Sequence, residues 1–286
     1  MHKHSPRDHD AADFPPMPEG RVIRLKKDWP ALLDLMPKLH TAATIYRSPE
    51  VLLCRMGRFA VTRRSGTCAY RLDGPQGDAL RTDLWSEAWW YEERRDGILR
   101  PCLEIADEKG RGFLKLCYRS TSDAAPDLTA VADLADSEGD GWDMLHVRQA
   151  NVLDCGCMRG RRKLPPAGPV IREGLTRLFH EFCMQGRPLG VVLPHNPATT
   201  WDEVPAERVT QAGCWTMLAG GGCNLHLRAT HFHHAEVLCR SARPVMICKD
   251  ETGEPLLTLV APEGPEPVSI AAFQRALSKH SNDFQR

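Results

Sequence analysis

The sequence predicts an α+β fold made by tandem duplication of one unit, a helix followed by an antiparallel β-sheet. Three observations support this prediction. A segment of 19 residues occurs twice, a pattern of apolar residues at helical spacing occurs twice, and the same offset of 143 residues separates both pairs. In a chain of 286 residues this offset is half the length. A repeat this long indicates a duplicated domain rather than a solenoid.

The repeated segment is a predicted β-hairpin. The sequence "RPCLEIADEKGRGFLKLCY" (100–118) aligns without a gap with "RPVMICKDETGEPLLTLVA" (243–261), and seven of 19 positions are identical. Each copy contains an apolar strand, an Asp-Glu-x-Gly turn and a second apolar strand, which is typical of a hairpin. We therefore expect Gly110 and Gly253 to lie at equivalent turns.

The second repeated element is a predicted amphipathic helix. Its apolar positions are Leu32, Leu35 and Leu39 in one copy and Leu175, Leu178 and Phe182 in the other. Residues three and four apart lie on one face of a helix, so both copies bury one face. We expect helices over residues 28–40 and 168–186, the second beginning after a proline near its first turn and ending at Gly186.

These elements divide the chain into four predicted parts. Residues 1–27 form a disordered N-terminal tail, because they are polar, rich in charge and proline, and lack apolar periodicity. Residues 28–136 form the first repeat and residues 170–286 the second. Residues 137–169 join them and contain a predicted helix at 142–153. Connecting segments of this length are often functional.

The composition excludes partners that are attracted by overall charge. The chain has 37 basic and 37 acidic residues, so no global field recruits nucleic acid or an anionic membrane. No run of 18 apolar residues occurs, so we expect no membrane span. The 11 cysteines are odd in number and lie mostly in apolar runs, which is typical of free thiols in a reducing cytosol. We expect a soluble, cytoplasmic protein.

The ordered set of elements resembles the HemS/ChuS-type haemin-degrading and haem-trafficking proteins and their single-unit ChuX/HutX relatives. The resemblance is carried by "MGRF" (56–59), "ALRTDLWSEAW" (79–89), "LTRLF" (175–179), "NLHLRATHFHHAEV" (224–237) and the two hairpins. It covers residues 28–122 and 170–265. It implies two large antiparallel sheets stacked on each other, with flanking helices and with haem held between the halves.

The resemblance also implies a site and a function. Proteins of this family bind the haem iron through a histidine between the halves, which faces an arginine of an L-x-L-R strand. On this sequence His146 corresponds to the metal ligand and Arg81 to the arginine. The implied function is haem transfer or haem degradation after uptake, as part of haem iron utilisation. The implied partners are haem and a haem-uptake transporter or haem oxygenase, and the implied assembly is a monomer or homodimer.

The chemistry of haem sets requirements that these residues can meet. Haem needs an apolar slot, an axial nitrogen and cations for two propionates. Because a guanidinium keeps its protons, Arg81 suits a propionate or a distal water better than iron. Trp85 and Trp89 are candidate walls of such a slot, or ordinary core residues.

The stretch "NLHLRATHFHH" (224–234) holds four of the 12 histidines. Alternation along a strand would place His226 and Arg228 on one face. It would likewise place His231 and His233 on a shared face. This face is a candidate haem or metal surface, or an ordinary solvent-exposed face.

Two further functions compete with haem binding. The chain could be a haem-free paralogue that keeps the duplicated scaffold as a structural or protein-interaction module. It could also bind zinc through Cys155, Cys157 and the histidine stretch, although a CxC pair supplies only two of four ligands. Whether the chain is an enzyme stays open, since any degradation would use the chemistry of bound haem.

Overall fold

The structure is a computed structural model, and it describes residues 22–39, 41–73, 76–95, 98–118, 129–140, 168–194, 197–212, 215–228, 231–240, 243–262 and 273. The predicted helix at 142–153 and His146 lie outside these residues, as does nearly all of the predicted N-terminal tail. Among the helices that the structure describes, none has the length and apolar character needed to cross a membrane.

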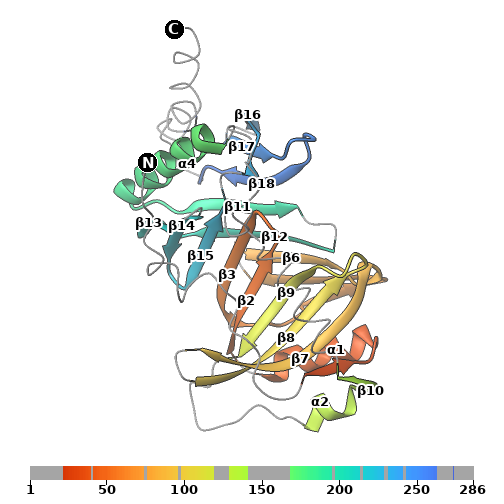
Figure 1. The fold of residues 1–286 in the computed structure, drawn as a ribbon. Helices are drawn as coiled ribbons and strands as arrows, with labels where there is room; N and C mark the ends of the chain where they lie inside the picture. The colour runs from red at the N-terminus through yellow and green to blue at the C-terminus, as the bar shows by residue number, and fades with distance from the viewer. Residues whose placement is uncertain are drawn as a thin grey trace, which may run out of the picture.

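Strands dominate both halves of the chain (Figure 1). The first half contains β1 (Ile23–Leu25), α1 (Trp29–Leu35), η2 (Met36–Leu39), β2 (Thr41–Arg47), β3 (Val51–Arg58), β4 (Arg63–Ser65), β5 (Cys68–Asp73), β6 (Gln76–Arg81), η3 (Thr82–Leu84), β7 (Trp85–Arg95), β8 (Ile98–Asp107), β9 (Gly112–Tyr118), α2 (Thr129–Asp133) and β10 (Ala135–Asp140). The second half contains α4 (Gly168–Gln185), β11 (Leu189–Pro194), β12 (Ala198–Val204), β13 (Arg208–Ala212), β14 (Trp215–Gly220), β15 (Cys223–Leu227), β16 (His234–Arg240), β17 (Arg243–Lys249) and β18 (Pro255–Val260).

The strands form two antiparallel sheets, and each sheet contains strands of both halves. The ten-stranded sheet has the order β10-β1-β7-β8-β9-β2-β3-β15-β14-β13. The eight-stranded sheet has the order β16-β17-β18-β11-β12-β6-β5-β4. The two orders correspond strand by strand. From β7 onward, each strand of the ten-stranded sheet has its equivalent in the other half at the same place in the eight-stranded sheet, beginning with β7 and β16 and ending with β13 and β4. The chain is therefore a tandem duplication whose halves exchange three strands each, and the predicted fold class is confirmed. The four-part division of the chain stays a prediction.

The repeated hairpins confirm the predicted equivalence of their turns. Gly110 and Gly253 have φ angles of 72° and 87°, a left-handed conformation that glycine adopts without a Cβ clash. In each turn an aspartate side chain, Asp107 or Asp250, accepts hydrogen bonds from two backbone N–H groups. The backbone N–H of each glycine also donates to the carbonyl of the same aspartate.

The two predicted helices form, but the first is shorter than expected. Asp28 caps α1 by accepting a hydrogen bond from the backbone N–H of Ala31. The α-helix ends at Leu35 and continues as a 3-10 turn, because Pro37 has no N–H and its ring disfavours the preceding helical turn. By contrast α4 runs over 18 residues and ends before Gly186, whose φ is 61°.

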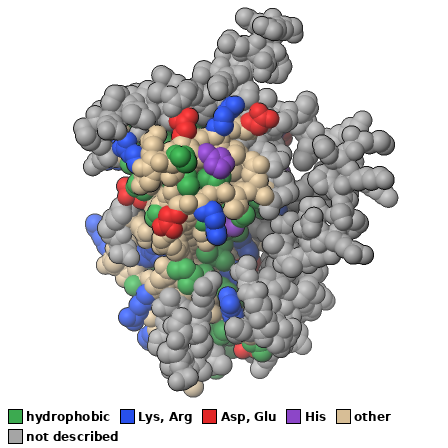
Figure 2. All heavy atoms as spheres, turned by 90° about the vertical axis from the view of Figure 1, so that its left-hand side faces the viewer, with side chains coloured by type: hydrophobic (Ala, Val, Ile, Leu, Met, Phe, Trp, Pro, Cys, Tyr) green, Lys and Arg blue, Asp and Glu red, His purple; other side chains and the backbone are tan. Residues whose placement is uncertain are grey.

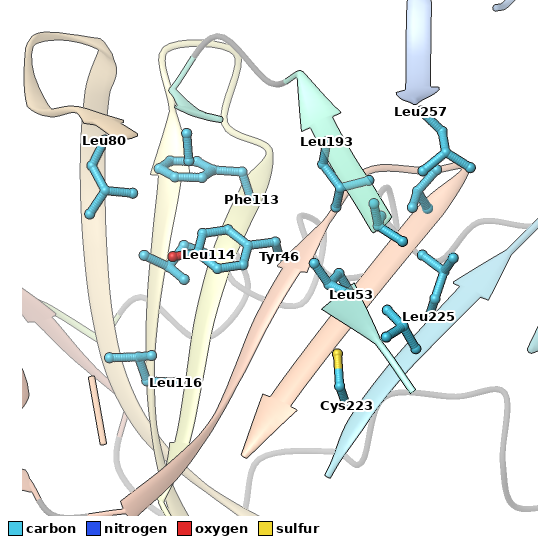
Figure 3. Packing of buried hydrophobic residues seen from close by; sticks show 14 of the residues in the cluster. Tyr46, Leu53, Leu80, Phe113, Leu114, Leu116, Leu193, Cys223, Leu225 and Leu257 are labelled. Atoms are coloured by element: carbon cyan, nitrogen blue, oxygen red, sulfur yellow. The ribbon is translucent and has the colours of Figure 1, made fainter. Parts of the chain in front are cut away.

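The hydrophobic core lies between the two sheets. Figure 3 shows Leu53, Leu114 and Leu225 of the ten-stranded sheet near Leu80 and Leu257 of the eight-stranded one, and all belong to one buried cluster. Burial of such apolar side chains is the main favourable contribution to folding.

A buried polar group also joins the sheets. Arg55 on β3 pairs with Asp78 on β6, and Asp78 also pairs with Arg71 and accepts a hydrogen bond from Thr200. Arg55 further pairs with Asp202 at 3.5 Å. Since Asp78 contacts this interior group and Leu80 the core, the side chains between them on β6 point to the outer face.

Candidate functional site

The outer face of the eight-stranded sheet carries a half-exposed surface centred on β6, which we name the β6 platform. Gly77, Ala79 and Arg81 point outward because Asp78 and Leu80 point inward. The strand register places Tyr70 and Thr199 on either side of Ala79. The full platform consists of Arg63, Cys68, Tyr70, Leu72, Gly77, Ala79, Arg81, Thr199 and Trp201.

The centre of the platform is flat and apolar. The indole ring of Trp201 lies directly over Gly77, where an added Cβ would come within 2.0 Å of the ring. Any side chain at position 77 would therefore displace the Trp201 ring from this position. Leu72 is 53% exposed, which is unusual for a large apolar side chain in the described part of the chain. Beside the Trp201 ring, the small side chain of Ala79 between Tyr70 and Thr199 gives a planar ligand close access to the sheet.

Two arginines lie at the margin of this apolar centre. Arg63 lies opposite Tyr70 in the register and is exposed, and Arg81 lies opposite Cys68 with a half-exposed side chain. Arg81 donates from Nε and Nη2 to the two carboxylate oxygens of Asp83, at 3.0 and 2.7 Å. These hydrogen bonds lower the pKa of Asp83 to about 2. Exposed ion pairs are weak, so Arg81 can turn from Asp83 to another carboxylate.

The equivalent place in the second repeat, at the end of β15, is buried. Arg228 is 1% exposed, and its guanidinium carbon lies 4.4 Å from the centre of the Trp215 ring. The His226 ring meets Trp215 edge to face at 6.3 Å. We name Trp215, His226, Arg228, His231 and His233 the β15 cluster.

His231 is a half-buried member of the β15 cluster whose ring reaches into the interior. Its backbone N–H donates to the Arg228 carbonyl, and its Nε2 is buried without a hydrogen-bond partner among the described residues. Burial lowers its pKa below 6.5, and the neighbouring Arg228 and His233 lower it further, while Glu50 raises it. The imidazole is therefore held neutral at pH 7.

The structure corrects the prediction that residues 224–234 form one histidine-bearing strand face. Strand β15 ends at Leu227, His231 and His233 lie in a connection, and β16 begins at His234 in the other sheet. The segment therefore crosses between the sheets. On the face that carries β13, β14 and β15, Figure 2 shows histidine side chains among hydrophobic and charged ones rather than a continuous histidine surface.

Trp85 and Trp89 do not line one slot together. Trp85 packs edge to face on Trp29 at 5.7 Å and belongs to the core between the sheets. Trp89 belongs to a second buried cluster with Tyr91. Both tryptophans are at most 5% exposed. They are core residues of β7, which was the ordinary interpretation of this aromatic run.

Access from solvent separates the two candidate sites. A ligand that arrives from solution can reach the exposed Arg81, whereas Arg228 and the Nε2 of His231 are closed off. The sequence interpretation missed Tyr70 and Trp201, which complete the platform. Alternation in "CAYRLD" and "ATTWDEV" predicts outward side chains at both positions, but the pairing of β6 with β12 across the two halves carries no local signal.

The residues of the β6 platform fit haem. A porphyrin is planar and apolar and carries two carboxylates, which match the apolar centre and the two arginines. Arg63 and Arg81 are two strands and two residues apart, so their Cα atoms are separated by roughly 12 Å. Among the platform residues, Tyr70 and Cys68 also offer atoms that can bind haem iron. Since β12 comes from the second half, the platform contains strands of both halves.

No family model and no curated protein matches this chain. Among solved structures, holo-PhuS, a haem-binding protein from Pseudomonas aeruginosa, is 17% identical with a TM-score of 0.67, over 90% of this chain and 86% of PhuS. The haem-degrading enzyme ChuS from Escherichia coli O157:H7 is 12% identical with a TM-score of 0.68, over 91% of this chain and 86% of ChuS. The chain therefore has the fold of PhuS and ChuS.

Proposed function

We propose that this chain is a cytoplasmic haem-binding protein that holds haem on the β6 platform and passes it on after uptake. The observation that carries the proposal is the half-exposed apolar face of Tyr70, Ala79 and Trp201, with two exposed arginines, Arg63 and Arg81, at its margin. The fold shared with PhuS, which binds haem, supports it.

The proposed contacts follow from the chemistry of the platform. The porphyrin ring lies against Tyr70, Trp201 and Ala79, and Arg63 and Arg81 pair with the propionates. Charge-assisted bonds from arginine to a carboxylate are among the stronger hydrogen bonds in proteins. The iron ligand that we propose from the family resemblance is His146, which lies outside the described residues. Bound haem would supply iron chemistry with O2 or peroxide, if degradation takes place.

A carrier role agrees better with this geometry than a degrading one. An open sheet face lets the ligand leave as well as enter, and an enzyme that attacks the macrocycle gains from a closed, water-free site. Degradation is kept as the second candidate because ChuS, which shares the fold, is a haem-degrading enzyme.

Titration of the purified full-length protein with haemin, followed in the Soret region, tests this proposal. Wild type should give a band distinct from that of free haemin. His146→Ala should lose the histidine-type spectrum and bind about tenfold more weakly, while apolar burial of the ring retains some affinity. His234→Ala, at an exposed histidine, is the matched control and should resemble wild type.

Three results would change the account. If His146→Ala keeps the wild-type spectrum and Tyr70→Phe loses it, the ligand is the platform phenol. If wild type gives no specific complex at micromolar haemin, the scaffold serves a haem-free interaction role and the proposal is wrong. Bleaching of the Soret band by O2 and ascorbate, in place of transfer to apomyoglobin, would favour degradation over carriage.

A further inference from the structure

A second buried group of reactive side chains lies on the outer face of the ten-stranded sheet, away from the β6 platform. Cys102 on β8 and Cys117 on β9 are directly opposite each other in the register. Glu93 on the adjacent strand β7 completes the group, and the two sulfurs and one carboxylate oxygen lie within 4.8 Å of one another. β7, β8 and β9 are neighbours in the sheet (Figure 1).

The charged residues around this group are also buried. Lys115 pairs with Glu93, and Arg47 pairs with Glu104, which also accepts a hydrogen bond of 2.7 Å from the Tyr91 hydroxyl. All four charged side chains are at most 6% exposed. Burial of charge is costly even when the charges are paired, so such a layer calls for a reason beyond packing.

The second repeat shows that the fold does not need this layer. In the equivalent hairpin, β17 and β18, Val245 and Val260 are paired in the place of the two cysteines. Two pairs further along, on the same face of the sheet, Ile247 and Thr258 stand where the first repeat has Glu104 and Lys115. The same backbone is thus covered by apolar and neutral residues in one copy and by thiols and charges in the other.

We propose that Cys102, Cys117 and Glu93 form a binding site for a thiophilic divalent cation of the zinc type. Two thiolates and a carboxylate are common zinc ligands, and a fourth position would be open to water. In tetrahedral zinc sites with bonds of about 2.0–2.3 Å, ligand atoms lie roughly 3.3–3.8 Å apart. The observed spread of 4.8 Å is within reach of small side-chain rotations.

Charge balance supports a divalent ion. The side chains of Arg47, Lys115, Glu93 and Glu104 sum to zero charge. A divalent cation that replaces the protons of two thiols leaves this sum at zero, whereas a monovalent ion would leave one negative charge in a buried site. Lys115 can keep its contact with Glu93 and stabilise that carboxylate while the carboxylate binds the ion.

Cobalt(II) is the probe that tests this site, because a thiolate ligand gives it a charge-transfer band that histidine and carboxylate ligands do not give. The full-length protein is used with Cys155 and Cys157 replaced by serine, which removes the CxC pair. Because the site is buried, the reduced, metal-free protein receives Co²⁺ both when folded and during refolding. We expect one equivalent of cobalt with a thiolate band, and displacement by zinc.

Matched variants decide whether the band comes from this site. Cys102→Val/Cys117→Val copies the valine pair of the second repeat, so it should fold and lose the band. Cys117→Ala gives a second test if the double variant folds poorly. Glu93→Gln should weaken cobalt binding by about tenfold, or about 1.4 kcal/mol. Cys248→Val, at a buried cysteine of β17, should keep the band.

Two outcomes would overturn the proposal. The first is a cobalt band that survives in Cys102→Val/Cys117→Val. The second is a reduced wild-type protein, with free thiols, that shows no band after either treatment. If peroxide then closes the cysteine pair as a disulfide, as thiol counting would show, the pair is a redox pair and the metal-site proposal is wrong. Haem binding is measured separately, so failure here leaves the proposed function untouched.

Discussion

The ends of β6 and β15 have the same backbone and opposite surroundings. The N–H of Arg81 donates to the carbonyl of Pro197, and the N–H of Arg228 donates to the carbonyl of Glu50. The side chain of Arg81 is half-exposed, whereas Arg228 is buried beneath Trp215. One copy therefore presents a cation to solvent and the other encloses it. Duplication kept the scaffold, and substitution of a few side chains made one copy open and the other closed.

In the hairpins it is the first repeat that buries polar and charged side chains. The first repeat buries thiols and charges on β8 and β9, and the second has apolar or neutral residues at the equivalent positions of β17 and β18. Because each copy acts as a control for the other, any side chain that departs from its counterpart can be tested by substituting the counterpart.

The largest expected effect is at Lys115. Lys115→Met should lower the free energy of unfolding by about 3–5 kcal/mol, because it leaves the buried Glu93 without its partner. Thr258→Met changes the equivalent position of the second repeat and should cost less, about 1–3 kcal/mol from overpacking alone. Urea unfolding of the metal-free proteins measures both. Equal losses would show that the charge pair has no special part in stability.

A smaller difference is expected between the two arginines. Arg228→Ala should cost about 2–4 kcal/mol, since it removes a buried side chain that packs on Trp215 and leaves a cavity. Arg81→Ala removes an exposed side chain and should leave the thermal midpoint unchanged within error. If the thermal midpoint fell equally in both variants, the end of β6 would be as closed as the end of β15, and the contrast between them would be wrong.

Local elements of this fold were predictable from the sequence, and their assembly was not. The turns at Gly110 and Gly253 and the end of α4 at Gly186 follow from residue types that favour one backbone conformation. The exchange of three strands between the halves depends on pairing between distant segments, such as β6 with β12. No local pattern encodes that choice.

The candidate site shows the same limit. Arg81 was found because it ends a recognisable L-x-L-R-like strand, but Trp201 joins the platform only through contact with Gly77 across the two halves. The histidines of residues 224–234 misled the strand prediction, because alternation was extended past Leu227 into a connection. The aromatic run at Trp85 and Trp89 is compatible with a slot or with the core, and in the structure both side chains are buried.

The smallest expected effect on stability concerns the pH response of the closed end. Burial lowers the pKa of His231 in the folded state, so the unfolded chain binds more protons as the pH falls below about 6.5. The stability that neutral His231 contributes is present above that pH and is lost as the pH falls through the folded pKa. Between about pH 7.5 and pH 5, wild type should lose more stability than His231→Gln, by less than about 1 kcal/mol because the side chain is only half-buried. Urea unfolding at both pH values measures the difference, and parallel losses would contradict a closed, neutral imidazole.

The haemin affinities of Arg81→Ala and Arg228→Ala test most directly whether the open end of the first repeat is the functional one. The account predicts that Arg81→Ala weakens haemin binding about tenfold, from the loss of one charge-assisted contact of roughly 1–3 kcal/mol. Arg228→Ala, measured where circular dichroism shows it folded, should bind haemin as wild type does. The opposite order, with Arg228→Ala impaired and Arg81→Ala unchanged, would place the ligand at the end of β15 and contradict the central claim.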